Sequence, residues 1–270
     1  MTKPYKFFVM LFTFLAYAAS GVIIAYILIK GIPNISPSLF EWNYNSTNVS
    51  IMPALISTLF TILLTLLITL PIGIFTAIYL SNYAKNKTFI KIVRFATEIL
   101  SSIPSIVYGL FGYLFFVSKA DYGLGMGYSL IAGCLTVAIM ILPTIIRTTE
   151  EAILTVNPLQ AHASLALGAT KIQTIFKIVI PEAMDGILGG IFLATGRIVG
   201  ESAALIYTMG TQPAMPKGIS NSVRTLAVHM YMLSSEGFHV NEAYATAVLL
   251  LVFVIIINWI SSRITKRLVN

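Results

Sequence analysis

The stretch "NPLQAHASLALGATKIQTIFKIVIPEAM", residues 157–184, decides the fold, because it predicts short surface helices inside a chain that is otherwise mostly apolar. Asn157 is a good N-cap, Pro158 suits the first helical position, and Gly168 is a natural helix stop. These three signals predict a helix from Pro158 to Leu167. At about 1.5 Å per residue, such a helix is far too short to cross a bilayer.

A second short helix is expected directly after the first. Thr170 can cap it, and we expect it to run to Ile180, where Pro181 ends it. The first helix carries one stripe of mostly small side chains at helical spacing, formed by Leu159, His162, Ala163, Ala166 and Leu167. A small-residue face on a helix without transmembrane length indicates a surface that receives a partner.

The rest of the chain has the composition of an integral membrane protein. Of its 270 residues, 57% are hydrophobic and 10% are charged, and the mean hydropathy is +0.87, whereas a soluble domain has about 25% charged residues. The formal net charge of +7 does not indicate nucleic-acid binding, because Lys and Arg lie in short groups between apolar runs. Cys134 is the one cysteine, which excludes a disulfide or a cysteine metal site within the chain.

Several apolar runs reach the length of about 20 residues that a membrane-spanning helix needs. They predict an all-α integral membrane protein with six spans, at Phe7–Ile29, Met52–Leu80, Phe95–Val117, Tyr128–Ile146, Gly186–Met209 and Tyr244–Ile260. The first run begins like a signal peptide, with "AYA" at residues 16–18, but it stays apolar well past that point. We therefore interpret it as an uncleaved anchor.

The distribution of Lys and Arg predicts the orientation. These residues are concentrated before the first span, between the second and third, between the fourth and fifth, and after the sixth. Under the positive-inside rule, both termini and the loop at about residues 148–185 are then cytoplasmic.

Prolines and glycines are frequent inside the spans. Pro71, Pro104 and Pro143 each remove a backbone hydrogen bond, which neighbouring helices or water must compensate, so the spans are expected to pack as a bundle. The fifth span also holds two small-xxx-small series, Gly186/Gly190/Ala194 and Gly196/Gly200/Ala204. They fit either close helix packing or a mobile gate.

The loop between the fourth and fifth spans resembles the EAA loop of ABC-importer permeases. "ASLALGA" (residues 163–169) and "IVIP" (residues 178–181) match its pattern, with Gly168 at the glycine position. His162 departs from the pattern, because the family usually has glutamate there. The resemblance continues over essentially the whole chain to the PstA-type permease subunit of phosphate importers. It is carried by residues 52–80, by "ILSSIPSIVYGLFGYLFF" (residues 99–116) and by "GRIVGESAAL" (residues 196–205).

The resemblance implies a division of labour between subunits. The chain would form a single transmembrane permease domain over residues 1–270, of the type I ABC importer kind, in the cell membrane of a prokaryote. The G-x-x-x-x-G-K-[ST] phosphate loop is absent from the sequence, so a separate ATPase is expected to use the ATP, and this chain is expected to be no enzyme and to bind no cofactor. The implied partners are two ATPase subunits that receive the Pro158–Leu167 helix, a related second permease, and an external binding protein that delivers inorganic phosphate. ATP-driven closure would rock the bundle between inward- and outward-facing states.

"GRIVGESAAL" places two charges, Arg197 and Glu201, where a membrane span is expected. They are one helical turn apart and can pair on one face. Either the pair is structural, or Arg197 offers its planar fork of donors to phosphate oxygens while Glu201 tempers the attraction. Arg94 and Glu98 repeat the spacing, as an interfacial pair that reaches water or as an exit-side waypoint for the anion. Arg147 is interpreted as topogenic, and the alternative is that it faces the pathway.

The histidines do not have the spacing of a metal site. Two of them lie in the outer segment 211–240, whose Val223, Leu226, Met230 and Leu233 recur at helical spacing. This amphipathic stretch fits a helix on the membrane surface or a landing site for a binding protein.

Three functions stay open from the sequence. An ABC phosphate permease is the first, and an ABC permease for another oxyanion or small solute is the second, since a fold does not fix a substrate. A passive channel is the third, and it would have no use for a docking helix.

Overall fold

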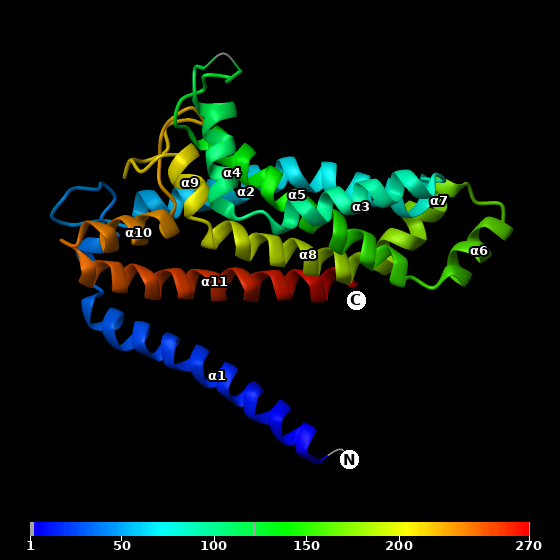
Figure 1. Ribbon diagram of the computed structural model, residues 1–270, viewed down its shortest axis with the longest axis horizontal. Coiled ribbons are helices and arrows are strands. Elements are labelled where there is room, and N and C mark those ends of the chain that lie inside the picture. The colour runs from blue at the N-terminus through cyan, green and yellow to red at the C-terminus, as the bar shows by residue number, and fades with distance from the viewer. Residues whose placement is uncertain (1–2, 121, 270) are drawn as a thin grey trace.

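The computed structural model of the chain describes residues 3–120 and 122–269, and these residues form helices and loops without a strand. The helices are α1 (Lys3–Gly31), α2 (Met52–Ile78), α3 (Lys87–Ser102), α4 (Ser105–Gly112), α5 (Leu130–Thr155), α6 (Pro158–Ala166), α7 (Lys171–Thr174), α8 (Ile180–Gly200), α9 (Ala203–Thr208), α10 (Leu226–Glu236) and α11 (Val240–Val269). The long helices run side by side, with α6 at one end of the bundle and α10 at the other (Figure 1). We call these the α6 end and the α10 end.

Within the described residues, five helices are long and apolar enough to cross a membrane, and the bent pair α3 and α4 makes a sixth crossing if it is counted as one span. The all-α membrane fold predicted from the sequence is therefore confirmed. The expected third span, Phe95–Val117, is not one straight helix, because α3 and α4 meet at an angle of 98°. Pro104 causes the break, since a proline disfavours helical backbone in the residue before it, and Ile103 is extended with φ −68° and ψ 131°.

The prediction that Pro181 ends a helix is wrong. A π-helical turn at Ile175–Val179 follows α7 and continues directly into α8, where Pro181 lies in the first turn. The wider turn shifts the hydrogen-bond register just before the proline, so that the missing N–H and the ring are accommodated. The second cytoplasmic helix expected from the sequence is thus the beginning of a span that covers Lys171–Gly200.

The expected fifth span, Gly186–Met209, is also interrupted. α8 ends at Gly200, the backbone is extended at Glu201 with φ −75° and ψ 125°, and the short helix α9 begins at Ala203. Arg197 therefore lies in the last helical turn before a break, and not in the middle of a continuous span.

α5 is the central helix, and it packs against α2 on one side and α8 on the other (Figure 1). Close approach at glycines makes this possible, because a β-carbon on Gly73 of α2 would meet Ile145, and one on Gly190 of α8 would meet Thr148. The packing interpretation thus holds for the series Gly186/Gly190/Ala194. It does not hold for Gly196 and Gly200, since a β-carbon on either would meet no neighbour within 4 Å.

α1 leaves the bundle at the α10 end and diverges from it (Figure 1). Its most apolar window is 0% buried, whereas that of α5 is 67% buried. α1 contacts α11 near Gly31, and the ring of Tyr26 packs edge-on against that of Tyr244 with centroids 5.9 Å apart. Nearly all of this helix is left for surroundings outside the chain.

Segment 211–240, which the charge distribution predicts on the outer side, folds against the chain's own bundle. α10 packs mainly on α11 and also on α2, and Leu226 and Leu233 are buried, as is Val223 just before the helix. Of the two alternatives left open from the sequence, a helix that rests on the membrane with this apolar face does not fit, because the bundle already covers the face; the landing site for a binding protein stays a prediction.

Candidate functional site

The helix α6 is built by local signals that the sequence carries. The side chain of Asn157 accepts a hydrogen bond from the Leu159 amide at 3.0 Å, and Pro158 opens the helix. Gly168 follows with φ +88°, a left-handed conformation that glycine adopts without strain. Thr170 then forms a capping box with Gln173. The predicted helix, its stop and the second cap are all confirmed.

One face of α6 is free. The predicted stripe is exposed along its length, from Leu159 at 70% to Leu167 at 90%. The other face packs on the chain, because Ala161 contacts the apolar cluster around Ile175, and the hydroxyls of Ser164 and Thr174 are 3.0 Å apart. α6 is therefore held in place by one side and presents the small-residue side outward.

The break after α8 separates Arg197 from Glu201. The expectation that they lie on one face of a single helix is wrong, because the helix ends between them. Glu201 is buried, and its Oε1 accepts the amide N–H of Ala204 at 2.9 Å. Arg197 is half-buried, and within residues 3–120 and 122–269 no carboxylate lies within 4.0 Å of its guanidinium. Its position in the last helical turn suits a cation, since the C-terminal end of a helix carries partial negative charge.

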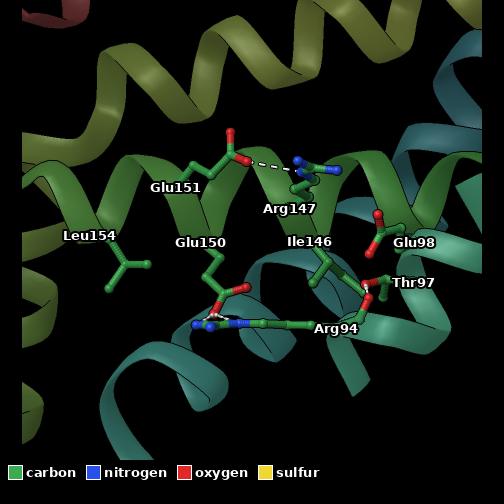
Figure 2. Close-up of a pocket in the computed structure, with 8 residues that line it drawn as sticks. All are labelled: Arg94, Thr97, Glu98, Ile146, Arg147, Glu150, Glu151 and Leu154. Atoms are coloured by element: carbon green, nitrogen blue, oxygen red, sulfur yellow. Dashed lines mark hydrogen bonds and ion pairs between the residues drawn. The ribbon is translucent and has the colours of Figure 1, made fainter. Parts of the chain in front are cut away.

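A cavity of about 320 Å³ opens between α3 and α5 toward the α6 end (Figure 2). Figure 2 shows the residues that line it, which are Arg94, Thr97, Glu98, Ile146, Arg147, Glu150, Glu151 and Leu154. Two arginines and three glutamates thus share one pocket. Its carboxylates outnumber its guanidinium groups, so an anion would enter it only in competition with them.

The ion pairs in this pocket differ from those expected. Arg94 does not pair with Glu98. Its Nε and Nη2 both donate to Oε1 of Glu150, at 3.1 and 2.6 Å. Glu150 is buried while half of the Arg94 side chain is exposed, so the pair joins α3 to the central helix. Arg147 pairs with Glu151 one turn on, at 2.9 Å and in an exposed setting.

Sequence reasoning did not include Glu150 among the site residues. A signal existed, because a glutamate near the end of an apolar span needs a cation. The identity of that cation depends on how α3 packs on α5, which no spacing in the sequence reveals. A group of three or more metal-ligating side chains is not found in the part of the chain that the structure describes.

The spans, the bundle and the exposed surface helix define a multi-pass membrane permease, a type of protein that is not itself a catalyst. The chain belongs to the family described as binding-protein-dependent transport system inner membrane component, whose model matches residues 69–270. It is thus an ABC importer permease of the inner membrane, as predicted.

Two relatives belong to the same kind of permease, and one solved structure shares the fold. The chain is 36% identical over 207 residues to the probable ABC transporter permease protein YqgI of Bacillus subtilis, which covers 69% of each chain. It is 34% identical over 236 residues to the phosphate transport system permease protein PstA of Haemophilus influenzae, which covers 86% of this chain and 82% of that one. A bacterial alginate ABC transporter, solved with an alginate-bound periplasmic protein, matches with a TM-score of 0.67 over 95% of this chain and 96% of that one. At 16% identity, this last likeness concerns the fold alone.

Proposed function

We propose that this chain is the permease subunit of an ATP-driven importer of inorganic phosphate, and that it forms the translocation pathway together with a second permease. The observation that carries the proposal is the similarity to the PstA permease of Haemophilus influenzae over 86% of the chain. The half-buried Arg197, which has no carboxylate partner among the described residues, supports an anion as the solute.

The coupling to ATP is proposed to run through α6. Its exposed face of small residues, between Leu159 and Leu167, suits a cleft on an ATPase subunit, because small side chains let two surfaces approach closely. His162 lies on this face where the family usually has glutamate, and the shape of the helix does not depend on it. The chain itself would bind no cofactor, and two ATPase subunits would bind and hydrolyse ATP on the cytoplasmic side, where both termini would also lie.

A second permease is proposed to cover surfaces that this chain leaves open. α1 diverges from its own bundle, and among the described residues no atom would lie within 4 Å of a β-carbon added to Gly196 or Gly200 on α8. Exposed glycines permit the close approach of another backbone. An external phosphate-binding protein would deliver the solute, by analogy with the periplasmic protein in the alginate transporter's complex. The α10 end is proposed for it because α6, the proposed ATPase contact, lies at the opposite end of the bundle (Figure 1).

Arg197 is the residue proposed to contact phosphate on this path. Its planar guanidinium can make two parallel hydrogen bonds to phosphate oxygens. Glu201, held at the helix break, would limit the affinity so that the anion is released. Arg94 and Glu98 would act as an exit-side waypoint, where phosphate competes with Glu150 for the Arg94 fork.

Reconstitution tests this proposal. The chain is co-purified with the candidate second permease and ATPase, placed in vesicles with ATP inside, and supplied with the binding protein and labelled phosphate. ATP-dependent phosphate uptake is expected. Uptake of another solute, with phosphate ignored, would favour the alternative of a permease for a different oxyanion or small solute. ATP-independent flux through the chain alone would favour a channel.

A further inference from the structure

A second group of polar side chains lies at the α10 end of the bundle. It consists of Tyr44, Arg224 and His229, which we call the outer cluster. Local bonds hold its backbone in place, since Thr225 is the N-cap of α10 and the amide of Leu226 donates to Oγ1 of Thr58 on α2 at 2.8 Å. The side chain of Arg224 is thereby positioned over the ring of Tyr44, 4.8 Å from its centroid.

Arg224 is a buried cation with unmet hydrogen-bond donors. It is only 5% exposed, and its Nε and Nη2 find no acceptor among the residues that the structure describes. Unpaired buried donors of a charged group are costly, and nearly all such groups in proteins have a partner. Tyr44 offers a cation–π contact and a nearby phenol oxygen, and the charge of Glu236 acts on Arg224 from further away, but none of these accepts a hydrogen bond from Nε or Nη2.

The two donors lie on the same edge of the guanidinium. Nε–H and one N–H of Nη2 point in parallel, which is the arrangement that binds two oxygens of a carboxylate or phosphate. Arg94 shows this edge in use, because its Nε and Nη2 both donate to Glu150. Arg224 therefore presents, in a buried setting, a fork that elsewhere in the same chain holds an oxyanion.

His229 adds a further unsatisfied group. It is fully buried, and its ring meets that of Tyr44 edge-on at 6.1 Å. The backbone of Val49 lies nearby, but neither Nδ1 nor Nε2 has a partner at hydrogen-bond geometry in the described part of the chain. Burial, together with the nearby charge of Arg224, lowers the pKa of His229 to about 3. The imidazole is then neutral at physiological pH, so Arg224 carries the cluster's positive charge and His229 can still donate one N–H.

We propose that the outer cluster binds a small oxyanion of the phosphate and sulfate kind, held on the Nε and Nη2 edge of Arg224. A small ion fits better than a partner protein, because the guanidinium is buried and a docking protein reaches exposed groups. Tyr44, whose ring lies against the guanidinium, also lines a cavity of about 390 Å³ together with Asn43, Gln212 and Lys217. Arg224 does not line this cavity, so an ion reaches the fork only when the Tyr44 ring moves aside, and Lys217 provides a second positive charge on that route. The site differs from Arg197, and it requires no particular transported solute.

Equilibrium binding of labelled phosphate to the purified full-length chain tests the proposal. All variants carry Arg197→Gln, so that the proposed pathway residue does not contribute, and unlabelled sulfate and chloride serve as competitors. Arg224→Lys keeps the charge and removes the fork. Lys119→Gln is the matched control, since it removes an exposed cation from a different loop.

The expected result is saturable binding with one site per chain, competition by sulfate but not by chloride, an affinity at least about tenfold weaker in Arg224→Lys, and no change in Lys119→Gln. Equal affinity in Arg224→Lys, no saturable binding, or competition by chloride alone would overturn the proposal. Thermal unfolding checks that Arg224→Lys is folded; if it is not, Tyr44→Leu, which uncovers the guanidinium, is expected to change the affinity as well. Failure of phosphate uptake in vesicles would count against the proposed transport function and not against this site.

Discussion

Two arginines at opposite ends of the bundle present the same edge of the guanidinium in different ways. At the α6 end, Nε and Nη2 of Arg94 donate to Glu150. At the α10 end, the same two atoms of Arg224 are buried without an acceptor in the described chain. Arg94 is thus satisfied by its own chain, whereas Nε and Nη2 of Arg224 find no acceptor in the described part of the chain, which is why we propose a ligand there. An arginine with a carboxylate partner in the chain joins two helices, whereas an arginine without one is a candidate binding site for an anion.

Arg197 belongs with Arg224 in this comparison. It is half-buried, and no described carboxylate is within ion-pair distance. The helix end gives it partial compensation through the backbone dipole, which is worth about 0.3–1 kcal/mol, well below the strength of a charge-assisted hydrogen bond pair.

The largest effect is expected at Arg197. Arg197→Gln removes the proposed phosphate contact, so we expect phosphate uptake in vesicles to fall by about a hundredfold while the complex still assembles. Uptake should fall less in Arg197→Lys, because this variant loses the fork but keeps the charge. Initial rates of ATP-dependent uptake measure both.

The double variant Arg197→Gln with Glu201→Gln separates a structural role from a transport role. It removes both charges and most of the desolvation cost. We expect assembly to be normal and uptake to stay low. Full recovery of uptake at normal expression would mean that Arg197 serves packing and does not contact the anion.

The next largest effect is expected at Arg94, the arginine that has a carboxylate partner within the chain. Arg94→Gln leaves Glu150 buried without its cation, so we expect the free energy of unfolding to fall by about 2 kcal/mol; this is less than for a fully buried pair, because Arg94 is half exposed. Arg147→Gln is the control, since its pair with Glu151 is exposed and screened by water, so its loss should change stability little. Chemical unfolding in detergent measures both, and equal losses would remove the distinction between the two pairs.

The contrast also explains what the sequence could predict. Features set within a few residues were predicted correctly: the caps at Asn157 and Thr170 and the left-handed stop at Gly168. The partner of Arg94 and the burial of Arg224 depend on segments that lie far apart in the sequence, so no local pattern contained them.

Two prolines inside helices also show that a local sequence signal does not decide the structure alone. Pro104 breaks a span as its chemistry favours, while Pro181 continues one because a π-turn before it absorbs the register shift. A proline marks a place where the backbone must adjust, and the packing around it decides whether the adjustment is a bend or a bulge.

The outer cluster also predicts a pH dependence. His229 has a pKa of about 3 in the folded chain, below its ordinary value of 6.5, and Arg224 and Tyr44 face it. The unfolded chain therefore binds the proton first, so stability is fully present above pH 6.5 and is lost as the pH falls from there toward 3, by up to about 1.4 kcal/mol per pH unit. His229→Phe should flatten the decline of Tm between pH 7 and 5. His239→Phe, at a partly exposed position, should leave the decline of Tm unchanged. An unchanged slope in His229→Phe would contradict the lowered pKa of His229.

A smaller effect is expected at Gly168, which ends the proposed docking helix α6. Gly168 has φ +88°, and a side chain there costs about 1–2 kcal/mol. Gly168→Val should leave membrane insertion intact and weaken ATPase association by up to about tenfold. Gly189→Ala, inside α8 and without a neighbour, is the control for glycine replacement. Normal association of Gly168→Val in a pull-down with the ATPase would refute the docking role of α6, while His162→Glu is expected to be tolerated.

The smallest effect is expected at two glycines of α8 that face different surroundings. A β-carbon at Gly190 would meet Thr148 of α5, whereas one at Gly196 would meet nothing within 4 Å. In the isolated chain, Gly190→Ala should therefore lower the free energy of unfolding. Gly196→Ala should raise it slightly, by under about 1 kcal/mol, since alanine favours helix over glycine. In the assembled permease pair, Gly196→Ala should instead destabilise the complex if a second backbone lies against this face. Unfolding of the isolated chain together with co-purification of the pair measures both states; a Gly196→Ala variant that is neutral or stabilising in each would show that lipid, and not a second permease, covers this side of α8.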